Sequence, residues 1–562
     1  MRRPKPSIAA GGGKTLLAAI LFLLIVCPLG MIFLRAVAVD GRLNLAAAWS
    51  EIAQAENVQT IFNSLALGAC VVALSTVIAA PLAWLFSRTE LARRRWLDVV
   101  FLIPFMTPPY IASMGWILFM QKRGLFQQLF PFTGQWSLHF FSFFGLVLVM
   151  SLHVFPFMMT ILKNAMRNIP SSLEESGAVF GARFGMRLRR IVLPLLSGNY
   201  AIGALLVFVK TLSEYGTPAT LGRWIGFYVF TTDIHRAAVV APIDFGRAAS
   251  LSAVLVAICM VLWLWQNGIT ARKSYRLLGG KGVRVQPLRL RRRQKALAWS
   301  YVAVVLLLAI GVPVFSCTVT SLIKLRGYGM QAGNYTLQHY VDLFTLNRKG
   351  INALWVSLLL AGSSASIAAA LGTAVALTAH GMKKRAGKAL EAVSLLPEML
   401  PGIVLVIGIM LFWNAVYRYV PLYNTLGMMV LAYTALFLPF TVQYVTSALT
   451  QLSGQLIWAG RAFGGTPAYV FCRITLPLTF KAIVSGWMMT FIIALRELVT
   501  ASLIAPPNVQ VISTYIMSQF DQGSVSVGMA MAVLTMALSV AALLGLNRLV
   551  RHGRAEEEPQ PH

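Results

Sequence analysis

The sequence predicts an all-α polytopic membrane protein of about 12 transmembrane helices, and three observations lead to this fold class. Of the 562 residues, 57% are hydrophobic and only 12% are charged. The apolar residues fall into blocks of about 20, the length that crosses roughly 30 Å of hydrocarbon as a helix. Segments of about ten residues with alternating polarity, which a membrane β-barrel requires, do not stand out.

These apolar blocks give twelve candidate spans. They lie near residues 15–35, 61–86, 97–120, 141–162, 196–214, 249–267, 297–317, 352–379, 391–414, 425–448, 479–496 and 526–547. The first block is longer than the apolar core of a signal peptide and has no small-x-small cleavage site before Arg35. We therefore expect it to be a retained span.

The basic residues predict how the spans are oriented. Every second connection is rich in Lys and Arg, and residues 271–295 hold ten of them with no acidic residue. Cytoplasmic loops of membrane proteins carry this excess. We therefore expect a multi-pass protein with both termini in the cytoplasm. The formal net charge of +30 then reflects topology, and no nucleic-acid partner is expected.

The chain contains an internal duplication. The motif Leu-x-Pro-x3-Pro-x6-Gly occurs in the third span and again 293 residues later in the ninth. Its proline and glycine positions are Pro104, Pro108 and Gly115 in the first copy and Pro397, Pro401 and Gly408 in the second. Two pseudo-symmetric six-span units of like orientation are expected from such a repeat. The predicted parts are a first unit at 1–270, a basic cytoplasmic linker at 271–296, a second unit at 297–550 and a cytoplasmic tail at 551–562.

A second repeated motif lies between the fourth and fifth spans of each unit, in segments 170–195 and 453–478. Both segments are predicted to be cytoplasmic and are too long for simple turns. Their motif positions are Glu175, Ser176, Gly177, Gly181, Ile191, Leu193 and Pro194, matched by Trp458, Ala459, Gly460, Gly464, Ile474, Leu476 and Pro477. Small residues allow close approach, Gly181 is expected to turn the chain, and Glu175 near a helix start would suit its positive end.

These segments resemble the Glu-Ala-Ala signature of bacterial ABC-importer permeases, which continues as Gly-x9-Ile-x-Leu-Pro. In that family the segment forms a short coupling helix that docks on the ATPase subunit. Trp458 departs from the pattern, so a salt bridge made by the Glu does not carry over to the second copy. Thr211–Pro218 and Arg496–Ser502 add to a resemblance that covers nearly the whole chain and is greatest to the fused permeases of ferric-iron importers.

The resemblance implies a function. The expected function is import of a small solute, iron(III) first, from a periplasmic binding protein across the bacterial inner membrane. Related permeases carry aminoethylphosphonate, polyamines, sulfate or sugar phosphates, which remain alternatives. A separate ATPase dimer would supply the energy, so the chain itself is not expected to be an enzyme. A secondary transporter, which needs no ATPase, and a channel or membrane scaffold are rival classes.

Glu214 and Glu497 occupy equivalent positions at the outer ends of the fifth and eleventh spans. A carboxylate at membrane depth is costly unless it is paired or faces water. Both residues are therefore candidates for the translocation pathway, with an ion pair to Lys210 or Arg496, or plain solvation, as the alternative. Pro104, Pro108, Pro397 and Pro401 are further candidates, because paired interruptions of matching spans can mark a substrate site. They can equally serve packing alone.

Other chemical signals are weak. The run Gly11-Gly-Gly-Lys14-Thr15 is similar to the end of a Walker loop, but Ile8 stands where that motif needs glycine. Cys27, Cys70, Cys259, Cys317 and Cys472 show no metal-binding or disulfide spacing. His153 is read as a neutral core or pore-lining imidazole. No cofactor, metal site or catalytic residue is therefore expected.

Overall fold

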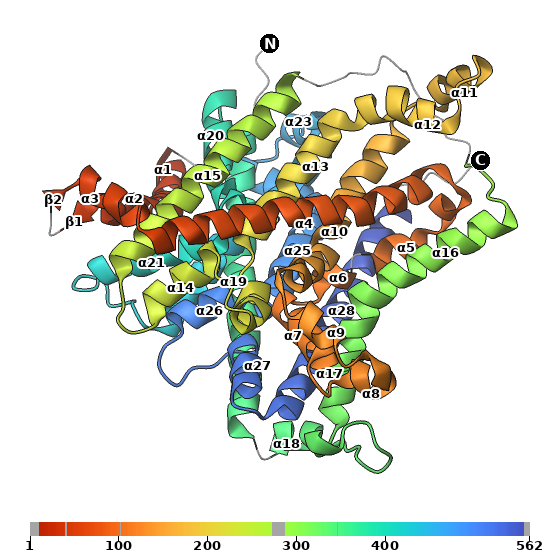
Figure 1. The fold of residues 1–562 in the computed structure, drawn as a ribbon. Coiled ribbons are helices and arrows are strands. Elements are labelled where there is room, and N and C mark those ends of the chain that lie inside the picture. Colours follow the sequence, from red (N-terminus) through yellow and green to blue (C-terminus); the bar gives the residue numbers. More distant parts are fainter. Residues whose placement is uncertain (1–10, 40–41, 102, 273–286, 346, 556–562) are drawn as a thin grey trace. The chain divides into compact units, whose positions relative to one another are not determined.

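The computed structural model describes residues 11–39, 42–101, 103–272, 287–345 and 347–555. The described chain is almost entirely helical (Figure 1). Its one strand pair, β1 (Ala38–Val39) and β2 (Arg42–Leu43), is an antiparallel hairpin with Ala38 opposite Leu43. Most of the predicted basic linker and the end of the predicted tail lie outside the described residues.

Ten described helices are long and apolar enough to cross a membrane. They are Gly12–Val37, Ala55–Arg88, Phe143–Arg167, Phe184–Ser213, Phe245–Gln266, Arg292–Leu322, Arg348–Gly381, Leu426–Gln451, Pro467–Leu495 and Val525–Gly545. A bent pair, Arg385–Met399 with Gly402–Ala415, makes an eleventh if it is counted as one span. The predicted fold class is therefore confirmed.

The third and ninth spans are broken at Pro108 and Pro401, two of the four prolines that the sequence singled out. In the ninth, α20 (Lys384–Met399) and α21 (Gly402–Ala415) meet at 107°. In the third, α5 (Arg95–Val100) and α6 (Ile103–Met106) precede α7 (Pro109–Met120). The other two prolines, Pro104 and Pro397, lie within α6 and α20. Pro108 and Pro401 stand just before α7 and α21 with nearly equal dihedrals, φ −56° and ψ 133° against φ −58° and ψ 130°. Proline lacks the N–H that a continuous helix needs, so both interruptions follow from the sequence.

The chain packs as two compact units. One comprises Met1–Ala53, Ile234–Val256 and Leu337–His562, and the other comprises Gln54–Asp233 and Ala257–Thr336. The first, called here the C-unit, contains the helices α1 (Gly11–Leu21), η1 (Phe22–Val26), α2 (Cys27–Val37), α3 (Leu45–Ile52), α18 (Gln338–Thr345), α19 (Arg348–Gly381), α20, α21, α22 (Leu426–Gln451), α23 (Gly454–Ala462), α24 (Pro467–Val470), η8 (Phe471–Thr475), α25 (Leu476–Leu495), α26 (Val499–Ile504), α27 (Ile512–Asp521) and α28 (Val525–Ala555).

The other, called the N-unit, contains α4 (Ala55–Arg88), η2 (Glu90–Arg93), α5, α6, α7, α8 (Leu125–Leu129), η3 (Pro131–Thr133), α9 (Trp136–Phe140), α10 (Phe143–Arg167), α11 (Ser171–Val179), α12 (Phe184–Arg187), η4 (Leu188–Val192), α13 (Leu193–Ser213), η5 (Pro218–Gly222), α16 (Arg292–Leu306), η6 (Leu307–Gly311), α17 (Val312–Leu322) and η7 (Arg326–Tyr328). The boundary falls within α14 (Phe230–Val239) and α15 (Phe245–Arg272).

The first span of each sequence repeat packs in the unit formed mainly by the other repeat. Within the C-unit α2 packs on α21, and within the N-unit α17 packs on α7. A Cβ at Gly408 would lie 2.5 Å from the carbonyl oxygen of Pro28, and one at Gly115 would lie 2.8 Å from Cα of Pro313. The repeated motif glycines are therefore required by close helix contact. That 1–270 and 297–550 act as functional units remains a prediction.

Candidate functional site

The two segments predicted to face the ATPase have the same local structure. Each consists of a nine-residue helix (α11 or α23), a one-turn helix (α12 or α24), a π-helical turn (η4 or η8) and a long span (α13 or α25). Each element of the second set begins 283 residues after its counterpart. We call α11 and α23 the candidate coupling helices.

Both candidate coupling helices end in the same hydrogen-bonded turn. Gly181 and Gly464 have φ of +79° and +82°, a conformation that glycine adopts without strain. The N–H of Gly181 donates to the carbonyl of Ala178, and the N–H of Ala182 donates to that of Gly177. Gly464 and Gly465 donate to the corresponding carbonyls of α23. This is a Schellman motif, so the glycine of each signature ends its helix.

The spacing between the small residue of each short helix and the isoleucine of the Ile-x-Leu-Pro run reflects a packing contact. A Cβ on Gly177 would lie 3.0 Å from Cδ1 of Ile191, and a Cβ on Gly460 would lie 2.6 Å from Cδ1 of Ile474. The isoleucine of each Ile-x-Leu-Pro run therefore packs on the small residue of the short helix. Because this isoleucine opens the following span, the coupling helix is attached directly to that span.

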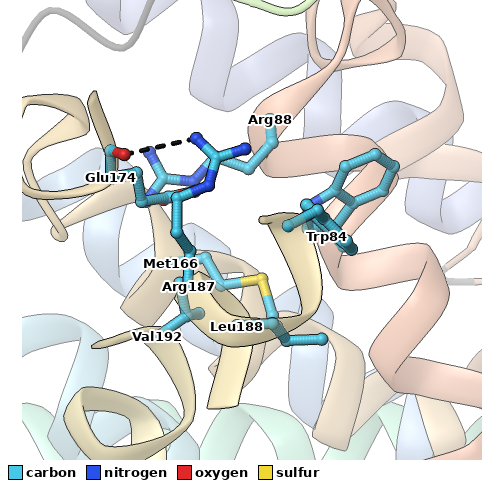
Figure 2. A pocket seen from close by; sticks show the side chains of 8 residues that line it. Trp84, Arg88, Met166, Glu174, Arg187, Leu188 and Val192 are labelled. Carbon is cyan, nitrogen blue, oxygen red and sulfur yellow. Dashed lines mark hydrogen bonds and ion pairs between the residues drawn. The ribbon is translucent and has the colours of Figure 1, made fainter. Parts of the chain in front are cut away.

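In the N-unit a charge pair adds to this attachment (Figure 2). Arg88, at the end of α4, lies 2.7 Å from Oε1 of Glu174, and their side chains are only 6% and 21% exposed. Arg88 also donates to the carbonyl of Ile169, and Arg187 donates to the carbonyl of Glu174. Separating a largely desolvated ion pair of this kind would leave an uncompensated charge, so the pair resists separation.

The expectation that Glu175 lies near the helix start is wrong. α11 begins at Ser171, so Glu174 is the acidic residue of its first turn and Glu175 is the fifth residue of the helix. Glu175 is exposed, whereas Glu174 is half-buried. The sequence analysis missed Glu174 and Arg88 because the signature draws attention to the residue after Glu174, and because Arg88 lies 86 positions earlier in the chain.

The C-unit has an apolar cluster at the matching place. Offsets of 293 and 283 put Leu377, Leu449 and Phe471 where the N-unit has Trp84, Met166 and Leu188. Leu377 and Leu449 are buried in one cluster, and Phe471 packs against it. Glu174 and Arg88 are matched in sequence by Ile457 and Gly381, so no corresponding ion pair can form.

Each candidate coupling helix exposes a phenylalanine at its end. Phe180 is 89% exposed and Phe463 is 91% exposed. Both stand immediately before the turn glycine, at equivalent positions of the repeat. An aromatic side chain fixed at a rigid turn and left uncovered is a common anchor of protein interfaces. Trp458, which replaces the signature Glu, is also exposed.

The carboxylates of Glu214 and Glu497 each accept hydrogen bonds from backbone N–H groups of the residues that follow them in the chain. Oε1 of Glu214 accepts from the N–H of Gly216 at 2.7 Å, and Oε2 accepts from that of Thr217 at 3.0 Å. Oε1 of Glu497 accepts from the N–H of Thr500 at 3.1 Å. Both carboxylates therefore stabilise the turn after a span, which is a structural role that the ion-pair alternative did not include.

Histidines and metal binding give little further chemistry. Nε2 of His235 lies 3.1 Å from Oγ of Ser502 within the C-unit. Burial lowers the pKa of His235 to about 4, so its imidazole is neutral at pH 7. His153 is half-buried in α10. Within the residues that the structure describes, no three His, Cys, Asp or Glu side chains form a group that could hold a metal ion.

The family of binding-protein-dependent transport system inner membrane components matches the sequence twice, over residues 72–275 and 362–554. These matches cover more than half of the chain. The chain belongs to this family. Each match contains one complete candidate coupling segment, and neither includes the first span of its repeat. The predicted duplication is therefore confirmed as two copies of a permease domain.

Named relatives agree with this family. The ferric transport system permease protein of Actinobacillus pleuropneumoniae is 24% identical over 88% of this chain and 71% of its own length. A putative ferric transport system permease protein of Haemophilus influenzae is 27% identical over 81% of this chain and 71% of its own. A putative 2-aminoethylphosphonate transport system permease protein of Salmonella typhi is 27% identical, but over 40% of this chain.

As a family member, the chain is a multi-pass inner-membrane permease subunit of a binding-protein-dependent importer. It is the membrane component and not itself the catalytic subunit. The rival classes of secondary transporter and channel are not supported by the family match.

Proposed function

We propose that this permease imports iron(III), delivered by a periplasmic binding protein, with energy from a dimer of separate ATPase subunits. The two matching coupling segments carry the proposal, because each presents a rigid short helix attached to the start of a span. The names of the relatives that match along most of the chain support iron as the solute. Basic connections between the spans support cytoplasmic positions for both segments and both termini.

The proposed role of each motif residue follows from its contacts. Gly181 and Gly464 end the helices, while Ile191 and Ile474 transmit movement because they pack on the short helix and belong to the π-helical turns that continue into α13 and α25. Phe180 and Phe463 are proposed to enter grooves of the ATPase subunits. Leu193, Pro194, Leu476 and Pro477 begin α13 and α25 directly after the π-helical turns η4 and η8. There the N–H groups of Leu193 and Leu476 donate to carbonyls five residues back, and each following proline, which lacks an N–H, is accommodated beside this local change of helix type.

Reconstitution tests the proposed function. Proteoliposomes containing the chain, its ATPase and the binding protein loaded with radiolabelled iron(III) should accumulate iron only when ATP is supplied. Parallel reactions with aminoethylphosphonate and sulfate test the alternatives that weaker relatives suggest. Uptake driven by an ion gradient without ATP would overturn the ATP-dependent mechanism, and ATP-dependent uptake of another solute alone would overturn iron.

The pathway assignment of Glu214 and Glu497 remains part of the proposal. Their turns follow matching spans at the ends that the basic connections predict to face outward, where solute would enter, and neither residue is fully buried. Glu214→Gln and Glu497→Gln should reduce iron uptake without lowering the amount of permease in the membrane. Normal uptake by both variants would leave these residues with their turn-stabilising role alone.

A further inference from the structure

A polar surface on α22 contains a carboxylate that the function described so far does not use. Between Met428 and Gln451 the exposed residues of α22 are all polar, namely Gln443, Tyr444, Ser447, Thr450 and Gln451. The other side chains of this stretch are buried or half-buried. Residues 443, 447 and 451 recur every four positions, so they share one side of the helix.

The matching span of the N-unit has the same character. Between Gly145 and Arg167, α10 exposes only Thr160 and Asn164, which correspond to Gln443 and Ser447 in the repeat. α10 and α22 are also the two most buried of the candidate spans. In both units the most enclosed span therefore leaves a polar surface uncovered, and hydrocarbon would solvate such a surface poorly. These surfaces suit an aqueous pathway better than a lipid contact.

The C-unit adds a negative charge to this surface. Nε2 of Gln443 donates a hydrogen bond to Oε2 of Glu398, which is exposed. Glu398 is the penultimate residue of α20, immediately before the break at Pro401. Among the described residues, no ion pair joins Glu398 to a cation. In the first repeat, position 398 corresponds to Phe105, so the carboxylate is present once in the chain.

We propose that Glu398, held in position by Gln443, is the contact point at which the permeating solute meets a negative charge, and that it selects a hard cation such as iron(III). Carboxylate and amide oxygens are ligands that hard cations accept. Broken helices are where membrane transporters place solute contacts, because the break leaves polar backbone beside the cavity. This inference rests on the proposed import function, since it requires a cationic solute.

Glu398→Gln is the main test, carried out in the reconstituted importer with iron(III) loaded on the binding protein. The loss of one charge-assisted contact should lower iron uptake by about tenfold. Membrane abundance and the ATP hydrolysis stimulated by the loaded binding protein should stay at wild-type levels. Glu398→Asp should keep part of the uptake, and Gln443→Leu should reduce uptake less than Glu398→Gln. The matched control is Glu391→Gln, two turns earlier on α20, which should leave uptake unchanged.

A thiol-accessibility experiment separates a pathway from a lipid or plain solvent surface. Ser447→Cys is introduced after replacing the five native cysteines by alanine, and a membrane-impermeant thiol reagent is added to inside-out vesicles. Labelling should be strong in the resting importer and fall when a non-hydrolysable ATP analogue closes the cytoplasmic side. Labelling that ignores the nucleotide, or no labelling in either state, would overturn the pathway position.

The outcomes are distinguishable from failure of the proposed function. If wild-type permease imports no iron, the proposed function fails. If wild type imports iron and Glu398→Gln does so equally well, only this inference is overturned. If Glu398→Gln does not reach the membrane, the uptake of Glu398→Asp and Gln443→Leu, together with Ser447→Cys labelling, decides the proposal.

Discussion

The two candidate coupling segments have the same backbone but different supports. α11 and α23 have equal lengths, identical turn glycines and equivalent contacts to an isoleucine of the following span. Beneath α11 lies the ion pair of Arg88 and Glu174, whereas beneath the matching part of the C-unit lies the apolar cluster around Leu377. The features held constant are those that shape the exposed end of the helix. The features that vary are those that attach it to its own unit.

Because their supports differ, the two segments should lose stability in different ways when residues are replaced. A desolvated ion pair is strongly directional, and removing one partner is costly because the other charge remains. An apolar cluster has no such directionality and loses stability in proportion to the volume removed. The two segments should therefore fail in different ways when they are perturbed.

The largest effect is expected from breaking the ion pair. Arg88→Met leaves Glu174 without its partner and should destabilise the N-unit by about 3 kcal/mol. Thermal unfolding of the purified permease, measured beside uptake, checks this value. The double variant Arg88→Met with Glu174→Leu should recover most of the loss, because it leaves no uncompensated charge. A double variant as unstable as the single one would contradict the role of the pair.

A smaller loss is expected in the C-unit. Leu377→Ala removes buried volume from the apolar cluster and should cost about 2 kcal/mol. Its effect should be insensitive to salt, because no charge is involved. The corresponding measurement is thermal unfolding at low and high ionic strength. A strong salt dependence would indicate that the cluster is not what supports this segment.

The next smaller effect is expected from replacing the turn glycines, Gly181 and Gly464. Arginine at a positive φ costs roughly 1–2 kcal/mol in either segment. Gly464→Arg should impair uptake more than Gly181→Arg, because α11 keeps its ion pair when its end is strained. Gly181→Ala and Gly464→Ala carry the backbone strain without the bulk and serve as controls. Equal losses in the two arginine variants would mean that the asymmetry has no effect on transport.

The smallest difference between the halves is expected at the exposed aromatic ends. Phe180→Ala and Phe463→Ala should each weaken association with the ATPase by about tenfold, the loss typical of one interface anchor. Copurification and titration of the ATPase measure this effect. Because the two side chains are almost equally exposed, their losses should be similar. A large inequality would place the functional difference at the docking surface and not beneath it.

Much of the fold could be predicted from sequence because membrane spans have a strong compositional signal. The repeat offsets of 293 and 283 located the broken spans and both candidate coupling segments, and the turn glycines Gly181 and Gly464 have the predicted turn conformation. Helix breaks at Pro108 and Pro401 followed from local chemistry alone. These features depend on residues close together in the chain.

The rest depends on contacts between distant residues, and no local pattern encodes those. The partner of Glu174 is Arg88 on another helix, and Glu398 was passed over because it meets Gln443 only in the folded chain. The signature also misdirected attention to Glu175, which is exposed. Glu214 and Glu497 do follow α13 and α25, as the sequence indicated, but their hydrogen bonds to the following turn were not foreseen.

The position of the first span has a consequence for how the protein is made. The helix α2 leaves the ribosome early, yet the helix on which it packs, α21, is synthesised only after most of the chain. Until then Pro28 cannot pack against Gly408, and lipid or an insertion factor must cover that surface. If the chain were cleaved in its linker, each fragment would contain the first-span helix that packs on the other fragment: α2 packs on α21, and α17 packs on α7. Because the two repeats are fused, every molecule is synthesised with both helices of this late-forming contact.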